Sequence, residues 1–286
     1  MKFAVSTYSF SQLIQKGEMT QLDCIAKAGE MGFDGVEMVE IADYAEGDLT
    51  AYAGRVAQEA ERCGVEVSNF AFGADFVNGS GGDRQQEIRR VMDMIDAAQI
   101  MGAPCVRHDV LYGLGPFRSF DQALPALAEA CREAAEYAAE KGIRTMSENH
   151  GFISQDSIRV EQLFNAVNHP NFSLLADMGN FLCVDENPVT AVSRVAPYAA
   201  YVHAKDFLVK AGDGPDPGRG FFKSRGGNYL RGTVIGHGAV PVRQCLDVLK
   251  KAGYDGYITV EYEGMEPALE GIAAGLENLK RYLGLV

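Results

Sequence analysis

The chain has 286 residues, of which 47% are hydrophobic, and its formal net charge is −13. This length fits one large α/β domain or two ordinary domains, and the apolar content is enough for a sizeable core. The negative charge argues against a protein that holds a nucleic-acid backbone, because such binding depends on basic contacts to phosphate. The sequence has no apolar run long enough to span a bilayer, and its start becomes polar too early for a secretory signal. Six single cysteines without a CxxC pair suit reduced thiols, so we expect a cytoplasmic protein without a membrane partner.

Apolar segments alternate with amphipathic helical segments along the whole chain. The predicted strands are 3–8, 35–39, 65–70, 105–108, 143–148, 172–177, 200–203 and 256–261. The predicted helices are 20–31, 49–63, 84–101, 123–141, 158–167, 188–195, 242–251 and 267–283. Several of these helices end at a glycine that precedes the next strand, which is typical of αβ loops.

Eight strands that alternate with eight helices predict an α/β fold, a (β/α)8 TIM barrel that forms a single domain over residues 1–286. The alternative is a doubly wound open sheet. It is less favoured because no Gly-rich GxGxxG turn follows the first strand.

The stretch from 206 to 239 shows no clear helix or strand. Loops of this length in a compact domain are usually functional lids or disordered segments. Its cations are Lys210, Arg219, Lys223, Arg225 and Arg231. We expect a lid-like loop over the catalytic face, in which Arg225 or Arg231 holds a carboxylate or phosphate of the substrate.

Four predicted strands in the second half of the chain end in Glu148, Asp177, His203 and Glu261. The carboxyl ends of barrel strands meet at one face, so three carboxylates and one imidazole would point into a single cup. Carboxylates this close repel one another unless a cation lies between them. We therefore expect one divalent metal ion, with Mn²⁺ favoured and Co²⁺, Mg²⁺ or Zn²⁺ left open by the ligand set.

Residues two apart along a strand share a face, so His150 would join Glu148 and Lys205 would join His203. Both are therefore candidates for binding substrate oxygens.

The ends of the second and fourth predicted strands would line the opposite wall of the cup. Glu37 ends the second strand, and Arg107 and His108 end the fourth. Because neighbours along a strand point to opposite sides, only one of Arg107 and His108 faces inward. We favour His108 and count it, with Glu37, as a substrate-binding residue.

Several motifs resemble the xylose isomerase-like barrel superfamily. They are Glu148-Asn149-His150-Gly151, Asp177-Met178-Gly179-Asn180, His203-Ala204-Lys205-Asp206, Glu261-Tyr262-Glu263 and a second-strand signature at 32–37. The most similar group within it comprises the sugar phosphate isomerases and epimerases, which include ketose 3-epimerases, hydroxypyruvate isomerases and inosose dehydratases. The resemblance implies that Glu148, Asp177, His203 and Glu261 are the metal ligands. It also implies that Glu148 and Glu261 double as the acid/base pair, and it is compatible with a homodimer or homotetramer.

The expected chemistry starts with removal of a proton next to a carbonyl, because a metal that binds the carbonyl stabilises the resulting enediolate. Two carboxylates on opposite faces of the carbon give epimerisation, a single base gives isomerisation, and loss of a β-hydroxyl gives dehydration. We expect a metal-dependent isomerase or epimerase of a sugar or sugar derivative. The alternative is a dehydratase of a keto-inositol or keto-cyclitol acid, and a non-catalytic binding barrel is a third possibility.

Departures from the resembling motifs narrow this choice. Asn180 stands where several relatives carry a histidine, which counts against a multi-metal nuclease of the endonuclease IV type. Ketose epimerases tend to share that histidine and to carry an Arg shortly after the seventh-strand histidine, where this chain has 207–209. We retain Asn180 as a substrate-binding candidate. His237 stands where relatives commonly have Glu, and its role stays open.

Overall fold

The structure, a computed structural model, describes residues 1–40 and 48–285. Within these residues eight parallel strands close into a barrel in the order β1-β11-β7-β6-β5-β4-β3-β2. The strands are β1 (Lys2–Ser6), β2 (Gly35–Val39), β3 (Glu66–Phe72), β4 (Cys105–His108), β5 (Arg144–Glu148), β6 (Phe172–Asp177), β7 (Ala199–Ala204) and β11 (Tyr257–Val260). The predicted single-domain (β/α)8 barrel is confirmed. The predicted span of 1–286 includes 41–47 and 286, which lie outside the described residues.

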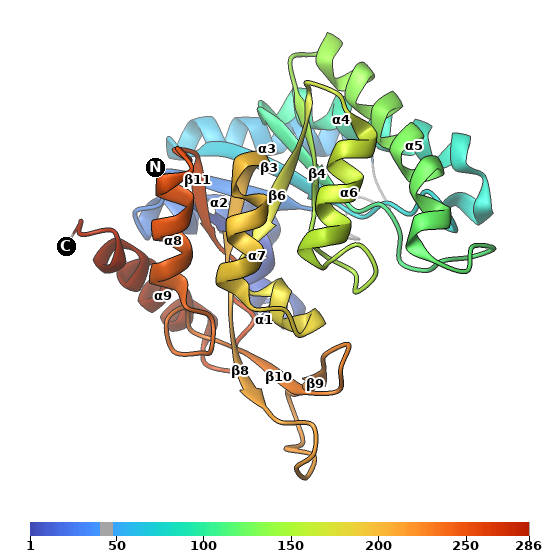
Figure 1. Ribbon diagram of the computed structural model, residues 1–286. Coiled ribbons are helices and arrows are strands. Elements are labelled where there is room, and N and C mark those ends of the chain that lie inside the picture. The colour runs from blue at the N-terminus through green and yellow to red at the C-terminus, as the bar shows by residue number, and fades with distance from the viewer. Residues whose placement is uncertain (41–47, 286) are drawn as a thin grey trace.

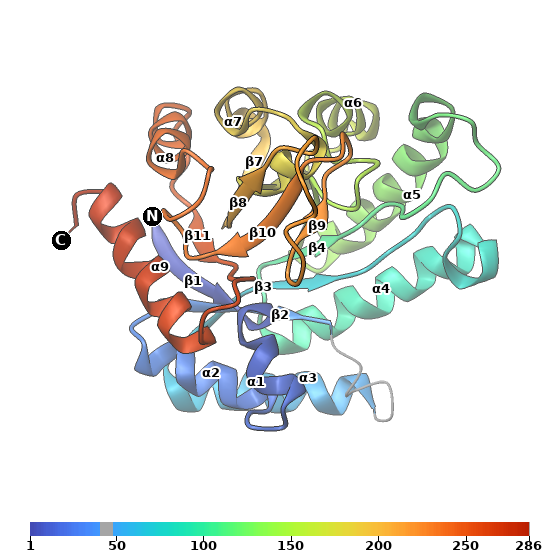
Figure 2. The same ribbon diagram turned by 90° about the horizontal axis from the view of Figure 1, so that it is seen from below.

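Helices surround the barrel on its outer side, as Figures 1 and 2 show from two directions. They are α1 (Ser11–Gln15), α2 (Gln21–Glu30), α3 (Leu49–Cys63), α4 (Arg84–Met101), α5 (Phe120–Glu140), α6 (Ser157–Val167), α7 (Pro188–Val195), α8 (Val242–Lys251) and α9 (Ala268–Tyr282). Gly64 and Gly102 end α3 and α4 in the left-handed conformation, with φ of 65° and 77°. This conformation is why glycine follows those helices and why their ends were readable in the sequence.

The barrel strands are buried on both faces, because the helices cover them outside and side chains fill them inside. All six residues of β6 are buried, including Asp177 at its end. A buried carboxylate at that position needs a partner, which directs attention to the carboxyl ends of the strands. None of the described helices is both long and apolar enough to cross a membrane.

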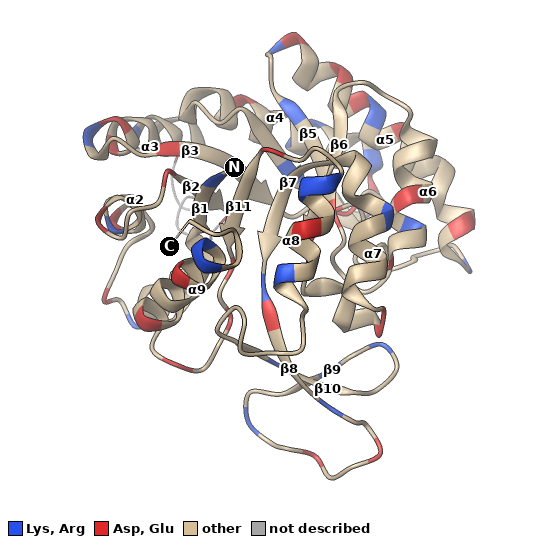
Figure 3. Ribbon diagram, turned by 60° about the vertical axis from the view of Figure 1, so that its left-hand side comes forward, with Lys and Arg blue, Asp and Glu red and all other residues tan. Residues whose placement is uncertain are grey.

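The prediction that 206–239 lacks regular structure is wrong. This excursion forms a three-stranded antiparallel sheet in the order β8-β10-β9, from β8 (Asp206–Lys210), β9 (Phe222–Lys223) and β10 (Tyr229–Thr233). The chain reverses between β8 and β10, so that Lys210 pairs with Tyr229 and Asp206 with Thr233. In Figure 1 the sheet extends away from the barrel, and in Figure 3 its ribbon is coloured for residues of both charges.

The excursion is fixed to the barrel at both ends and packs on the segment after β6. Phe207 and Leu230 form a small buried cluster with Cys183, which lies in the 3-10 helix η4 (Asn180–Val184). The buried Asp206 carboxylate accepts backbone N–H bonds of 2.8–2.9 Å from the residues at 207, 236, 238 and 240. A side chain at Gly238 would collide with this carboxylate, since its Cβ would lie 2.2 Å from Asp206 Oδ1.

Candidate metal centre

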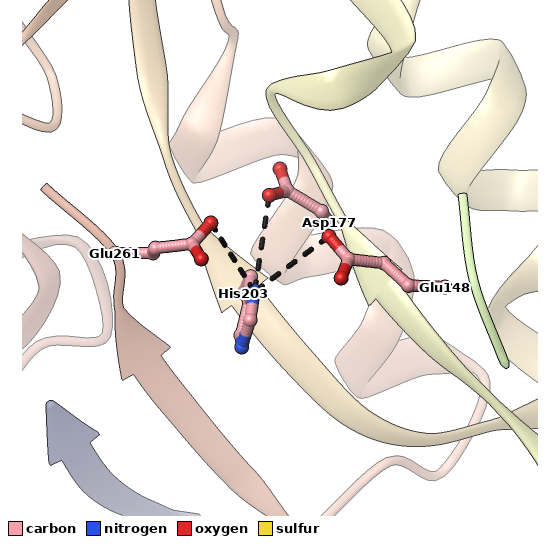
Figure 4. Close-up of side chains that lie close together, drawn as sticks. All are labelled: Glu148, Asp177, His203 and Glu261. Atoms are coloured by element: carbon pink, nitrogen blue, oxygen red, sulfur yellow. Dashed lines mark ion pairs between the residues drawn. The ribbon is translucent and has the colours of Figure 1, made fainter. Parts of the chain in front are cut away.

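Four side chains meet at the carboxyl ends of β5, β6, β7 and β11. Glu148, Asp177, His203 and Glu261 each offer one donor atom, and these atoms all lie within 4.8 Å of one another. His203 Nδ1 is 3.8 Å from Glu148 Oε1, 3.9 Å from Asp177 Oδ2 and 3.4 Å from Glu261 Oε2. Figure 4 shows the imidazole below the three carboxylates, with all four groups directed toward a common point.

The unsatisfied atoms of this cluster fit a divalent cation. Asp177 Oδ2, His203 Nδ1 and Glu261 Oε2 are buried and make no hydrogen bond of good geometry, although the two carboxylate oxygens form ion pairs with the Lys205 ammonium. A buried polar atom without a good hydrogen bond costs free energy, and three such atoms around one point are the donors that a cation would use. One nitrogen and three carboxylate oxygens suit a divalent metal of the Mn²⁺, Co²⁺, Mg²⁺ or Zn²⁺ kind.

Glu148 is held at both of its oxygens. Arg107 Nε donates to Oε2 at 2.6 Å, and Asn180 Nδ2 donates to Oε1 at 2.8 Å. Arg107 is buried, and burial works to lower its pKa, but Asp109 and Glu148 outweigh burial and raise that pKa. The guanidinium therefore keeps a permanent positive charge behind Glu148.

Lys205 occupies the other side of the cluster. Its Nζ lies 2.5 Å from Glu261 Oε2, 3.2 Å from Asp177 Oδ2 and 3.0 Å from Glu263 Oε1. Burial works to raise the pKa of Glu261, but Lys205 and His203 outweigh it and hold that pKa well below its usual range. Burial raises the pKa of Asp177 to about 7 although Lys205 works to lower it, and the neighbouring Glu261 and Glu148 add to the rise.

A cavity of about 230 Å³ opens directly over the cluster and is lined by Glu148, His203, Lys205 and Glu261. Arg107, Asp109, Tyr112 and His150 also line it. His150 Nδ1 is 2.8 Å from Asp109 Oδ1, and Tyr112 Oη donates to Asp109 Oδ2 at 2.5 Å. Burial works to lower the pKa of His150, but Asp109 outweighs it and raises that pKa.

The prediction that His108 faces the barrel interior is wrong, and Arg107 takes the inward position. His108 is fully buried, with its ring packed near Phe72, Phe76 and Phe172. This apolar setting lowers the pKa of His108 to about 4, because burial disfavours the charged ring. Arg107 and His108 point to opposite sides of β4, as predicted, but the residue that faces inward is Arg107.

Glu37 also lies away from the cavity, contrary to its prediction as a substrate-binding residue. It is fully buried inside the barrel, where its Oε2 is 2.9 Å from His203 Nε2. It therefore contacts a candidate metal ligand from behind and is out of reach of a substrate.

The remaining substrate-binding candidates separate into two groups. His150 and Lys205 line the cavity, whereas Asn180 is buried beside it and contacts Glu148 and Lys205. Arg225 pairs with Asp156 at 2.9 Å, and neither it nor Arg231 lines the cavity.

Arg231 lies 3.7 Å from Glu266. His237 is exposed and contributes only its backbone N–H to a turn with Val234.

The residues that line the cavity without having been predicted from the sequence include Tyr8, Asp109, Tyr112 and Glu263. Two of them carried a usable signal. Asp109 directly follows a strand that ends in two polar residues, and Glu263 is two positions after Glu261, which places both on one face if the extended chain continues. The two tyrosines lie in connections after β1 and β4, where hydrophobic periodicity does not predict which way a side chain points.

The comparisons with known proteins agree with this fold. The inosose dehydratase of Lacticaseibacillus casei is 26% identical to this chain over 158 residues, which are 55% of this chain and 52% of that protein. The chain thus matches about half the length of this curated relative.

Two solved structures resemble the whole barrel. One is a protein assigned as the 3-DHS dehydratase AsbF of Bacillus anthracis, with a TM-score of 0.75 and 18% identity over 98% of this chain and 99% of that one. The other is a D-tagatose 3-epimerase-like protein, with a TM-score of 0.73 and 21% identity over 100% and 98%. At such identities the two structures establish the fold alone.

The family model described as xylose isomerase-like TIM barrel matches residues 25–282, which is most of the chain. The match includes seven of the eight barrel strands and all four members of the cluster. The chain therefore belongs to the xylose isomerase-like TIM barrel family.

Proposed function

We propose that this protein is a divalent-metal-dependent dehydratase that removes water from a polyhydroxylated cyclic ketone, such as a keto-inositol or a keto-cyclitol acid. The proposal rests on how the two glutamates and His150 are bound: neighbouring side chains hold both glutamates, whereas the ring of His150 faces the cavity. Glu148 is bound by Arg107 and Asn180, and Glu261 is bound by Lys205. His150 uses only Nδ1, toward Asp109, and its ring lines the cavity.

The metal site would be formed by Glu148, Asp177, His203 and Glu261, with Mn²⁺ as our first choice. When bound there, a divalent cation supplies a Lewis acid that polarises a carbonyl oxygen and stabilises the negative charge left by proton removal. The buried Asp177 Oδ2, His203 Nδ1 and Glu261 Oε2 lie around one point without a hydrogen bond that satisfies them, and this supports the assignment.

His150 would act as the base. The Asp109 carboxylate holds Nδ1, which fixes the tautomer and leaves Nε2 for the substrate. In this mechanism Nε2 takes the proton from the carbon next to the carbonyl and returns it to the hydroxyl that leaves from the next carbon. The carbon–oxygen bond breaks, a carbon–carbon double bond forms, and one water leaves the substrate. The imidazole ends in the protonation state in which it began.

Arg107 and Lys205 would fix the remaining groups. The Arg107 guanidinium contacts the carboxylates of both Glu148 and Asp109 and holds them in place. Lys205 holds Asp177, Glu261 and Glu263 together and can donate to a substrate hydroxyl. A small polyhydroxylated ligand suits a polar cavity of this size, and the inosose dehydratase that matches about half of this chain supports dehydration.

A second candidate is the isomerase or epimerase of a sugar or sugar derivative. It is favoured by the placement of Glu148 and Glu261 on β5 and β11, on two sides of the same cavity. In that reaction these glutamates would be the acid/base pair. A homodimer or homotetramer remains a proposal for the assembly. The six free cysteines fit the cytoplasmic location that we infer.

The experiment that separates these functions uses purified protein with Mn²⁺, Co²⁺, Mg²⁺ or Zn²⁺ and a panel of inososes, dehydroshikimate and free ketoses. Products are analysed by mass spectrometry and by NMR in D₂O. We expect loss of water from a cyclic ketone that depends on added metal. Products that have lost no water and that carry deuterium next to the carbonyl after reaction in D₂O would instead establish the isomerase or epimerase.

A further inference from the structure

We propose that Glu37 is a positioning residue that acts through His203 and directs the imidazole Nδ1 to the metal. This inference rests on the metal site of the proposed function. Glu37 is the middle residue of β2, far in sequence from the four proposed ligands, and belongs to the opposite half of the barrel.

The contact between the two side chains is short and fully enclosed. Glu37 Oε2 is 2.9 Å from His203 Nε2, and both residues are at most 1% exposed. Asn69 Nδ2 donates to the same Oε2 at 2.8 Å, which fixes the orientation of the carboxylate. The Glu37 carboxylate therefore accepts at Nε2, and the other ring nitrogen faces Glu148, Asp177 and Glu261 (Figure 4).

This contact determines which nitrogen of the ring can bind a metal. A neutral imidazole has one N–H donor and one lone pair. Since Glu37 is an acceptor only, Nε2 carries the proton and Nδ1 carries the lone pair. A carboxylate behind the ring also makes the metal-binding nitrogen more basic, and removal of such partners usually weakens metal binding.

A purely structural role does not explain Glu37. Its second oxygen, Oε1, is buried and has no hydrogen-bond partner, and Asn69 Oδ1 is in the same position. An apolar side chain would fill this place without the free-energy cost of burying a carboxylate. The arrangement is costly for folding and useful for holding an imidazole.

The test compares metal binding by the wild type, Glu37→Gln and Ser68→Ala, measured by isothermal titration calorimetry with Zn²⁺ and Mn²⁺. Ser68 is a matched control, because its buried hydroxyl bonds to Tyr201 at 2.7 Å and no contact joins it to His203 among the described residues. We expect Glu37→Gln to weaken binding about 10–100-fold, and Ser68→Ala to change it less than about two-fold. Thermal unfolding without metal should leave Glu37→Gln at least as stable as the wild type.

The outcomes separate this inference from the proposed function. If the wild type binds neither metal, the proposed function fails. If the wild type binds and Glu37→Gln binds equally well, the role of Glu37 is wrong while the proposed function stands.

A spectroscopic measurement on the wild type decides the question even if Glu37→Gln does not fold. Long-range ¹H–¹⁵N correlation spectra of the zinc-loaded protein should show His203 protonated at Nε2 and metal-bound at Nδ1. Zinc bound through Nε2 would overturn the inference.

Discussion

The two halves of the barrel contribute differently to the site. The second half, β5, β6, β7 and β11, places Glu148, Asp177, His203 and Glu261 around one point. The first half, β2 to β4, supplies groups that contact these residues from the side or from behind, namely Glu37 and Arg107. The comparison indicates that one half binds the proposed metal while the other fixes the geometry and charge of the residues that bind it.

The largest effect should come from the second half. His203→Ala removes the one nitrogen donor of the cluster and leaves three carboxylates with less compensation. We expect loss of metal binding and at least about 10³-fold lower turnover, since the proposed chemistry depends on the metal. Calorimetry and product assays check this. Turnover that stays within ten-fold of the wild type would show that the reaction does not depend on a metal at this site.

The next largest effect should come from a residue of the first half, and it should be a change in the free energy of unfolding. Arg107→Met leaves the buried Glu148 and Asp109 without their shared cation. Breaking a buried charge pair in this way costs about 3–5 kcal/mol, and we expect that loss in urea unfolding of the metal-free protein. Lys2→Met removes the exposed pair with Glu66 and is the control. Equal stability of the two variants would mean that the Arg107 contacts contribute no more than a surface pair.

His150 sharpens the comparison, because it belongs to the second half but is held by Asp109 of the first. His150→Gln should lower kcat by about 10² or more while metal affinity stays within a few-fold. His237→Gln, at an exposed position, is the control. A variant with weakened metal binding and normal kcat would assign His150 to the metal site and leave the proposed base unidentified.

The pH dependence of stability should reflect Asp109. Burial works to raise its pKa, but Arg107 and His150 outweigh burial and lower it. A lowered folded-state pKa contributes stability above the unfolded-state pKa, about 3.9, and this contribution is lost as the pH falls toward the folded-state value. Metal-free wild type should therefore lose more stability than Asp109→Asn below about pH 4. Parallel unfolding curves for the two proteins between pH 2.5 and 7 would contradict this.

The smallest effect should come from the excursion outside both halves. Arg225→Ala removes a pair with Asp156 in which the arginine side chain is 36% exposed. Such pairs contribute about 0–1 kcal/mol, and we expect KM to change less than about two-fold. A ten-fold rise in KM would show that the excursion closes over the substrate and that Arg225 reaches it, as a lid would.

The barrel and the clustering of Glu148, Asp177, His203 and Glu261 could be predicted from the sequence, because both depend on local patterns. Apolar strands, glycine-terminated helices and acids at strand ends are each visible within a few residues. The sequence did not show which residues of a short strand face the barrel interior. It also did not show which segments far apart in the chain come into contact. His108 and Arg107 are neighbours in a four-residue strand and both are buried. Their surroundings distinguish them, since Arg107 lines the cavity and His108 packs among aromatic rings.

The excursion and the support of the ligands were unpredictable for a related reason. Lys210 and Tyr229 become neighbours only when the chain reverses, and the intervening loop has no periodic signal. Glu37 was expected at a strand end beside the substrate, but it is the middle residue of β2. Its contact with His203 joins residues 166 positions apart in sequence and left no local signal.

The anchoring of the excursion by Asp206 has a consequence for how this barrel can vary. The carboxylate ties the first residues of the excursion to 236, 238 and 240, so the chain leaves and re-enters the barrel rim at nearly one point. Between these anchors the excursion also contacts Cys183 and Asp185, so the exposed stretch 210–216 between β8 and β9 is the part that can change in length without moving β7 or α8. Descendants of this scaffold, or a protein engineer, could therefore insert a new segment there while the strands that hold the four clustered side chains stay in place.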